Sequence, residues 1–221
     1  MFAKAWYSTS DEHSVQILSA FWQVLQQAGL NQAADIILID LGSNLGAINR
    51  TALIAADYVI VPVAPELLSV QGLEHSGMTL QKWRNAWQQK LTHNSVAGLN
   101  LPQGKLQPIG YVIFQPPIRL DHGTNMYAKW TMQIPTSYHQ TMFNETEENV
   151  PFLKDDPHFL ILFKGHYSVI PMAQEARKPI FHLKPADGAL GAHLKIVQSA
   201  YVEFQQLARK IAKRVGVRCT D

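Results

Sequence analysis

Four short apolar runs stand out along the chain, at residues 36–39, 58–63, 109–114 and 158–163. Runs of this length, rich in Ile, Val and Phe, are typical of strands buried on both faces of a parallel sheet. Each is bounded by Gly, Pro, Asn or charged residues, which end strands. We therefore predict four buried strands, with a weaker one at 179–183.

The segments between these runs have helical periodicity. Apolar residues recur at three- and four-residue spacing, with polar residues on the opposite face. The first stripe, led by Val15 and Leu18, predicts a helix that stops at Gly29. The other predicted helices cover a crossover before residue 58, then 67–91, 125–143 with an interruption at Pro135, 170–178 and 190–214.

Strands that alternate with helices predict an α/β fold, with a mostly parallel sheet flanked by helices. The length of 221 residues favours a single α/β domain over 1–221. Residues 92–107 are polar and predict a surface loop, and the acidic stretch 144–157 predicts an exposed connection. Residues 118–157 carry no recognisable functional signal.

Composition excludes several classes of protein. One cysteine, Cys219, excludes an internal disulfide, and no apolar run reaches the roughly 18 residues of a membrane span. The net charge of +2 gives no argument for nucleic acid from the whole molecule. No Cys-x-x-Cys or His-x-x-x-His pair predicts a transition-metal site, and no Gly-x-Ser-x-Gly elbow predicts a serine hydrolase.

Asp40 directly follows the first apolar run, and a Gly-containing loop comes after it. Ligands of open α/β sheets bind at the carboxyl ends of the strands. A carboxylate in that place can hold Mg²⁺ through its water shell beside nucleotide phosphates. Asp40 alone is also compatible with any α/β sheet in which a strand ends in Asp.

The whole block 34–73 resembles the ParA/MinD family of partition ATPases. In that family a strand ending in Asp-x-Pro-Pro-Ser-Leu-Gly precedes Asn-Ala-Leu-x-Ala-Ala-Asp and Val-x-x-Pro-Val-x-Pro. The matching positions here are Asp40, Leu45, Gly46, Ala52, Leu53, Ala55, Ala56, Asp57, Pro62, Val63, Pro65, Gly72 and Leu73. Gly42 and Ser43 replace the two prolines, and Asn44 replaces the serine. The resemblance is moderate at 108–115 and 170–183 and thin elsewhere.

The phosphate-binding loop of this family does not occur in the sequence. Neither Gly-x-x-x-x-Gly-Lys-Ser/Thr nor Lys-Gly-Gly-x-Gly-Lys-Thr is present. In the family this loop lies near the N-terminus, before the Asp block. We therefore expect the chain to be the C-terminal, truncated portion of a ParA-like protein, which lacks the P-loop strand and helix.

The resemblance implies a set of site residues and ligands. Asp40 would order the water of Mg²⁺, and Gly42 and Asn44 would lie near the γ-phosphate of ATP as catalytic loop residues. Gln115 and Arg119 would approach the adenine, and Gln174 and Glu175 would face the nucleotide or a partner. The alternative for these four is a solvated or loop-positioning role. An intact relative would dimerise across ATP and hydrolyse it with a ParB-like partner.

The last predicted helix has a basic face. Its cations are Lys195, Arg209, Lys210, Lys213 and Arg214, which fall within about 140° of arc. Partition ATPases bind non-specific DNA through such residues, and phosphate contacts give salt-sensitive affinity. A solvated face that complements the helix dipole is the alternative, and Glu203 in the same arc weakens the patch.

Three hypotheses remain open. The first is a ParA-like protein with no useful ATPase activity of its own. The second is a non-catalytic module that binds DNA, or that pairs with itself or with a full-length paralogue. The third is a relic without function, whose unpaired strand edge would aggregate. A cytoplasmic location, possible association with the nucleoid and no membrane contact are expected in each case.

Overall fold

The computed structural model describes residues 1–8, 12–42, 44–93, 100–115 and 124–219. The chain divides into two compact units. The first unit comprises Met1–Val59 and His75–Ile109, and the second comprises Ile60–Glu74 and Gly110–Asp221. The prediction of a single domain stays a prediction, because two compact units can belong to one folding domain.

Helices α1 (Phe2–Tyr7), α2 (Glu12–Asn31) and α3 (Ala47–Ala55) belong to the first unit, with most of α4 (Leu67–His93). Its core contains the buried side chains of Ala5, Trp6, Leu18, Ile54, Trp83 and Trp87. Trp87 is fully buried, and its Nε1 donates a hydrogen bond to the carbonyl of Pro102 at 2.9 Å. Gly104 lies against the same indole with φ +61°, so the loop before β2 closes this core.

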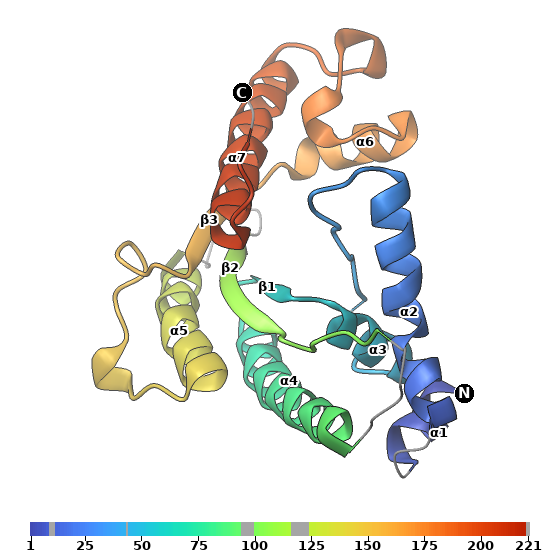
Figure 1. Ribbon diagram of the computed structural model, residues 1–221. Coiled ribbons are helices and arrows are strands. Elements are labelled where there is room, and N and C mark those ends of the chain that lie inside the picture. Colours follow the sequence, from blue (N-terminus) through green and yellow to red (C-terminus); the bar gives the residue numbers. More distant parts are fainter. Residues whose placement is uncertain (9–11, 43, 94–99, 116–123, 220–221) are drawn as a thin grey trace. The chain divides into compact units, whose positions relative to one another are not determined.

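Three strands, β1 (Tyr58–Val63), β2 (Gln107–Gln115) and β3 (Phe159–Lys164), form one sheet in the order β1-β2-β3. The strands β2 and β3 run parallel, with Val112 opposite Ile161. The sheet is flanked by helices, which confirms the predicted α/β class (Figure 1).

The second unit adds α5 (Thr124–Phe143), α6 (Ile170–Ala176) and α7 (Ala192–Val215) to this sheet, with short 3₁₀ turns between them. Phe204 and Leu207 of α7 pack on Val112 and on the core residues of β3. A second cluster joins α6 to the start of α7 through Val169, Ala173, Leu183, Ala189 and Val197. The predicted apolar stripe of α7 therefore lies partly on its buried face, since Val197 is buried and Phe204 packs on the sheet, whereas Tyr201 is 50% exposed.

The predicted strand at 36–39 is wrong, because these residues form no strand in the structure. Ile36, Ile37 and Leu38 are 38%, 39% and 79% exposed. A strand requires a neighbour that pairs with its backbone, and within the described residues none pairs with this segment. Asp40 is therefore exposed at the end of an unpaired connection rather than at the end of a sheet strand.

Two other predicted elements differ. Residues 180–182 form a 3₁₀ turn instead of a strand, because His182 N bonds back to the carbonyl of Pro179 at 2.9 Å. Helix α5 continues through Pro135, since Ile134 and Pro135 are buried and packing offsets the lost backbone bond.

Helix α2 continues past Gly29 to Asn31, and Ala33 takes the left-handed conformation with φ 49°. Residues 92–93 extend α4, and 94–99 lie outside the described residues. In the part of the chain that the structure describes, no helix is long and apolar enough to cross a membrane.

Candidate functional site

The Asp40 loop is a short, internally bonded turn before α3. Asn49, in the first turn of α3, donates hydrogen bonds from Nδ2 to the carbonyls of Gly42 (2.8 Å) and Asn44 (2.7 Å). The side chain of Asn44 in turn accepts a hydrogen bond from Gly46 N at 3.0 Å. Asp40, Gly42 and Asn44 are exposed. The three residues predicted for catalysis therefore lie together, and Asn49 fixes the loop that carries two of them.

Arg50 anchors α3 beneath this loop. Its guanidinium carbon lies 4.7 Å from the ring centre of Trp6 and 4.9 Å from that of Trp83, so the cation is close to two indoles. Its Nε and Nη1 are buried without a hydrogen-bond partner among the described residues. The aromatic rings therefore supply the main contacts of this cation. Arg50 holds α3 on the core of the first unit and so positions Asn49.

The loop fits one part of a Mg-ATP site. Mg²⁺ commonly binds through one or two carboxylates, waters and substrate phosphates, and Asp40 offers one exposed carboxylate that makes no ion pair among the described residues. No group of three or more His, Cys, Asp or Glu side chains within the described ranges could hold a metal by itself. ATP phosphates need a backbone cradle with lysine, and the sequence has no such motif. The residues present therefore fit the metal side and not the phosphate side.

The residues predicted to face the base belong to the second unit. Gln115 ends β2, where it pairs with Lys164 of β3, and Arg119 lies outside the described residues. Gln174 and Glu175 are exposed on α6. The structure therefore brings the loop residues together within one unit and places Gln115, Gln174 and Glu175 in the other.

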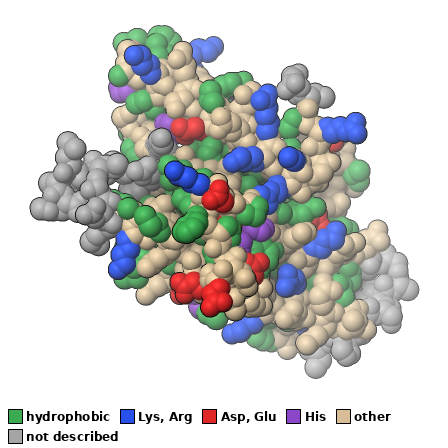
Figure 2. Space-filling model, turned by 90° about the vertical axis from the view of Figure 1, so that its left-hand side faces the viewer, with side chains coloured by type: hydrophobic (Ala, Val, Ile, Leu, Met, Phe, Trp, Pro, Cys, Tyr) green, Lys and Arg blue, Asp and Glu red, His purple; other side chains and the backbone are tan. Residues whose placement is uncertain are grey.

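On the basic face of α7, Lys195, Arg209, Lys210 and Lys213 are exposed, and Arg209 makes an interaction with another group. Lys210 also donates a hydrogen bond to the carbonyl of Leu160, and Arg214 donates one to that of Pro157. These two cations attach α7 to the start of β3. In Figure 2, Lys and Arg side chains are interspersed with hydrophobic and uncharged polar ones on the face shown.

A buried polar network is centred on His139 and Asp156, in the stretch 118–157 that carries no functional signal in the sequence. Asp156 accepts hydrogen bonds from Tyr111 Oη at 2.6 Å and from His158 N at 2.7 Å. His139 bonds Asp156 through Nε2 at 3.0 Å and Glu145 through Nδ1 at 2.7 Å. The side chain of Asp156 is completely buried, so the predicted exposed connection at 144–157 is wrong at this residue.

The geometry sets the protonation of this network. Carboxylates accept hydrogen bonds, so a ring with one carboxylate at each nitrogen is satisfied only as imidazolium. Burial alone would lower the pKa of His139, but the hydrogen bonds to Asp156 and Glu145 outweigh it, and its pKa is raised above 6.5. Burial and then the nearby His139 lower the pKa of His158, which stays neutral. The sequence could not reveal this network, because its members meet only in the tertiary structure.

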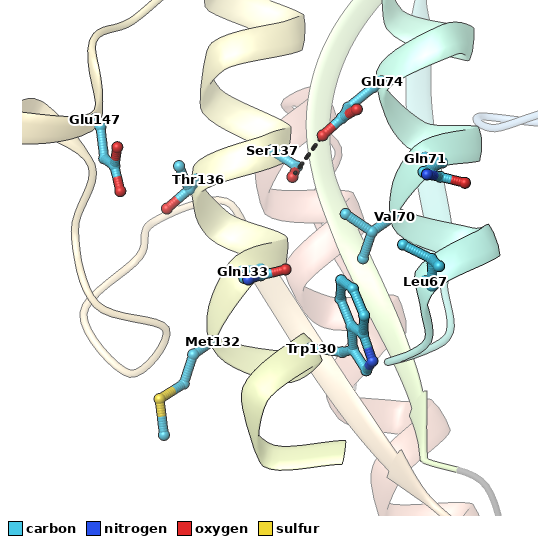
Figure 3. Close-up of a pocket in the computed structure, with 10 residues that line it drawn as sticks. All are labelled: Leu67, Val70, Gln71, Glu74, Trp130, Met132, Gln133, Thr136, Ser137 and Glu147. Atoms are coloured by element: carbon cyan, nitrogen blue, oxygen red, sulfur yellow. Dashed lines mark hydrogen bonds between the residues drawn. The ribbon is translucent and has the colours of Figure 1, made fainter. Parts of the chain in front are cut away.

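An open pocket of about 440 Å³ lies beside α4 and α5 in the second unit. Figure 3 shows the indole of Trp130 directed toward Val70 and Leu67, and Ser137 Oγ donates a hydrogen bond to Glu74 at 3.3 Å. None of the sequence-predicted site residues lines this pocket. The pocket has one hydroxyl–carboxylate pair, Ser137 and Glu74, but their hydrogen bond is long and no histidine is among the lining residues, so the geometry does not by itself indicate catalysis.

Comparison with known proteins gives two matches. A family model described as an AAA domain matches residues 12–93, which contain the Asp40 loop, α3 and β1. Protein IncC of Escherichia coli is 28% identical over 116 residues, which is 52% of this chain and 26% of the relative. The chain thus spans about a quarter of the length of this curated relative. No solved structure matches.

Proposed function

We propose that the chain is a ParA/IncC-like partition protein that supplies the metal-side carboxylate and switch loop of a Mg-ATP site. The observation that carries this proposal is the AAA-domain match over 12–93, which includes Asp40 and the loop held by Asn49. The similarity to Protein IncC covers 116 residues, or 52% of this chain. Activities of the intact relatives, namely dimerisation across ATP and DNA binding, come to this chain as part of the proposal.

In this role Asp40 would hold the Mg²⁺ ion through its water shell, and Gly42 and Asn44 would form the loop on the γ-phosphate side. The carboxylate is exposed and can accept hydrogen bonds from metal-bound water. Asn49 acts as a positioning residue, because it fixes the carbonyls of Gly42 and Asn44.

The chain does not hydrolyse ATP by itself under this proposal. Phosphoryl transfer depends mostly on positioning and electrostatic stabilisation of the phosphates. The 221 residues include no Gly-Lys-Ser/Thr motif to supply them. Hydrolysis would then require a ParA-type paralogue with its own phosphate-binding loop, and a ParB-like protein is the expected stimulating partner.

The test measures Mg²⁺-dependent binding of a fluorescent ATP analogue and ATP turnover by the purified chain. We expect background turnover and weak binding whose Mg²⁺ dependence is lost in Asp40→Asn. Asp35→Asn is the matched control, since Asp35 is also exposed and lies just before the same segment. Turnover like that of an intact ATPase would refute the non-catalytic assignment. Equal Mg²⁺ dependence in both variants would refute the role of Asp40.

A second candidate function is binding of non-specific DNA by α7, favoured by the exposure of Lys195, Arg209 and Lys213. Each phosphate contact contributes roughly one unit to the slope of log affinity against log salt. Lys195→Glu with Lys213→Glu should lower the slope by about two. Lys4→Glu with Lys154→Glu, which changes net charge equally, should leave the slope nearly unchanged. Fluorescence anisotropy with a duplex oligonucleotide at several salt concentrations measures the slope for each double variant. Identical slopes for the two double variants would exclude DNA binding by this face of α7.

A further inference from the structure

The connection at 36–40 has the chemistry of an unpaired strand edge. The backbone N–H and C=O groups of these residues make no hydrogen bond within the described residues. Residues 36–39 are an unbroken run of aliphatic side chains, and Asp40 follows it. Leu38 is 79% exposed, and Ile36 and Ile37 are each more than a third exposed. Open backbone groups beside aliphatic side chains are the features that recruit a further strand.

One face of this connection is already fixed. A Cβ atom added at Gly29 of α2 would lie 3.0 Å from Cδ1 of Ile37, so the bare glycine backbone lets Ile37 approach the helix closely. Side chains of an extended chain alternate between its two faces. If Ile37 faces α2, Ile36 and Leu38 face the other way. The contact at Gly29 therefore assigns Ile37 to the face toward α2.

The charges at its two ends distinguish between possible partners. Asp35 and Asp40 flank the aliphatic run, both are exposed, and neither has an ion pair among the described residues. An antiparallel second copy would place Asp35 opposite Asp40, and a parallel copy would place each residue opposite itself. Like charges in directly opposed positions destabilise strand pairs. The charge pattern thus disfavours self-pairing and favours a strand with a cation at each end.

We propose that residues 36–39 accept a β-strand from a different protein, with about four aliphatic or β-branched residues flanked by Lys or Arg. The partner's backbone would satisfy the open N–H and C=O groups, and its cations would pair with Asp35 and Asp40. This inference shares Asp40 with the proposed Mg-ATP site, but it rests on the backbone, exposure and charge of this segment and not on ATP binding.

The test uses two capped, dye-labelled peptides, Lys-Val-Thr-Val-Ile-Lys and Glu-Val-Thr-Val-Ile-Glu, with the full chain at low salt. We expect the Lys-flanked peptide to bind about tenfold more tightly and to protect the amides of 36–40 from hydrogen exchange. Asp35→Lys with Asp40→Lys should reverse this preference. Glu147→Lys with Asp155→Lys changes net charge equally at exposed acids of the second unit and should not reverse it.

The proposal would be overturned if the two peptides bound with equal affinity, or if a peptide bound without protecting the amides of 36–40. It would also be overturned if the Glu147/Asp155 double variant changed the peptide preference as much as the Asp35/Asp40 double variant. Concentration-dependent protection of these amides without peptide would also overturn it, because the occupant would then be a second copy. A Lys-flanked peptide with N-methylated backbone amides provides a further check, since it keeps the charges and loses the strand donors. It should bind weakly.

Discussion

Replacement of Asp156 by Asn tests whether the buried polar network holds the second unit together. The carboxylate accepts hydrogen bonds from Tyr111, from His158 N and from the His139 ring, and its side chain is fully buried. Asparagine keeps the shape but removes one of the two carboxylate charges that oppose the imidazolium of His139, and Glu145 keeps the other. The neighbouring Asp155 is exposed, so Asp155→Asn is a control with the same chemical change one residue away.

The expected magnitude follows from these contacts. Loss of one partner of a buried ion pair typically costs about 3–5 kcal/mol, because the other charge stays buried. Asn Oδ1 can still accept from Tyr111 or from His158 N, which returns roughly 1 kcal/mol. We therefore expect Asp156→Asn to lower the free energy of unfolding by about 2–4 kcal/mol. Asp155→Asn should lower it by less than about 0.5 kcal/mol.

Urea unfolding followed by circular dichroism gives the total loss, and hydrogen exchange locates it. The amides of β3 belong to the second unit, so their protection should fall in parallel with the free energy of unfolding. Protection around Trp87 in the first unit should change much less. A loss below about 1 kcal/mol, or equal losses in the two variants, would refute the role given to the network.

Three further predictions concern pH and two packing sites. Since the pKa of His139 is raised above 6.5, its stabilisation is present below pH 6.5 and lost as pH rises through the folded value. Since the pKa of His158 is lowered, the free energy of unfolding falls again as pH drops below 6.5. The free energy of unfolding should therefore be largest near pH 6.5. The variant His139→Gln should weaken its decrease above that pH. Gly104→Ala would place a Cβ 2.2 Å from Trp87 at φ +61°, so it should lower the free energy of unfolding by more than about 2 kcal/mol. Gly188→Ala is the control, because it has φ +89° but open space around it, and it should lower this free energy by about 1 kcal/mol in the same urea assay. Arg50→Lys should cost about 1–2 kcal/mol by tryptophan-monitored unfolding, because an ammonium cannot stack on two indoles, and a loss no larger than that of the exposed Arg177→Lys would argue against the stacking.

Periodicity predicted most helices and three of the four main strands, because these elements bury faces that they carry in their own sequence. Helix α7 is the clearest case, since its stripe lies on β3 through Phe204 and Leu207. The same reasoning failed at 36–39. An aliphatic run records the tendency to form a strand, but a strand also needs a neighbour to bond with, and none pairs with this run within the described residues.

For the candidate site, the sequence alone determined the Asp40 block and the absence of a Gly-Lys-Ser/Thr motif, because both are patterns of adjacent residues. Only the tertiary structure decided which polar residues act on others. Asn49 bonds the loop from the next helix, Arg50 lies against tryptophans from α1 and α4, and His139 meets Asp156 across 17 positions. It also assigned Lys210 to the β3 carbonyl of Leu160 and Arg214 to the carbonyl of Pro157, which precedes β3. Contacts between residues far apart in the chain depend on how the elements pack, and local spacing cannot encode them.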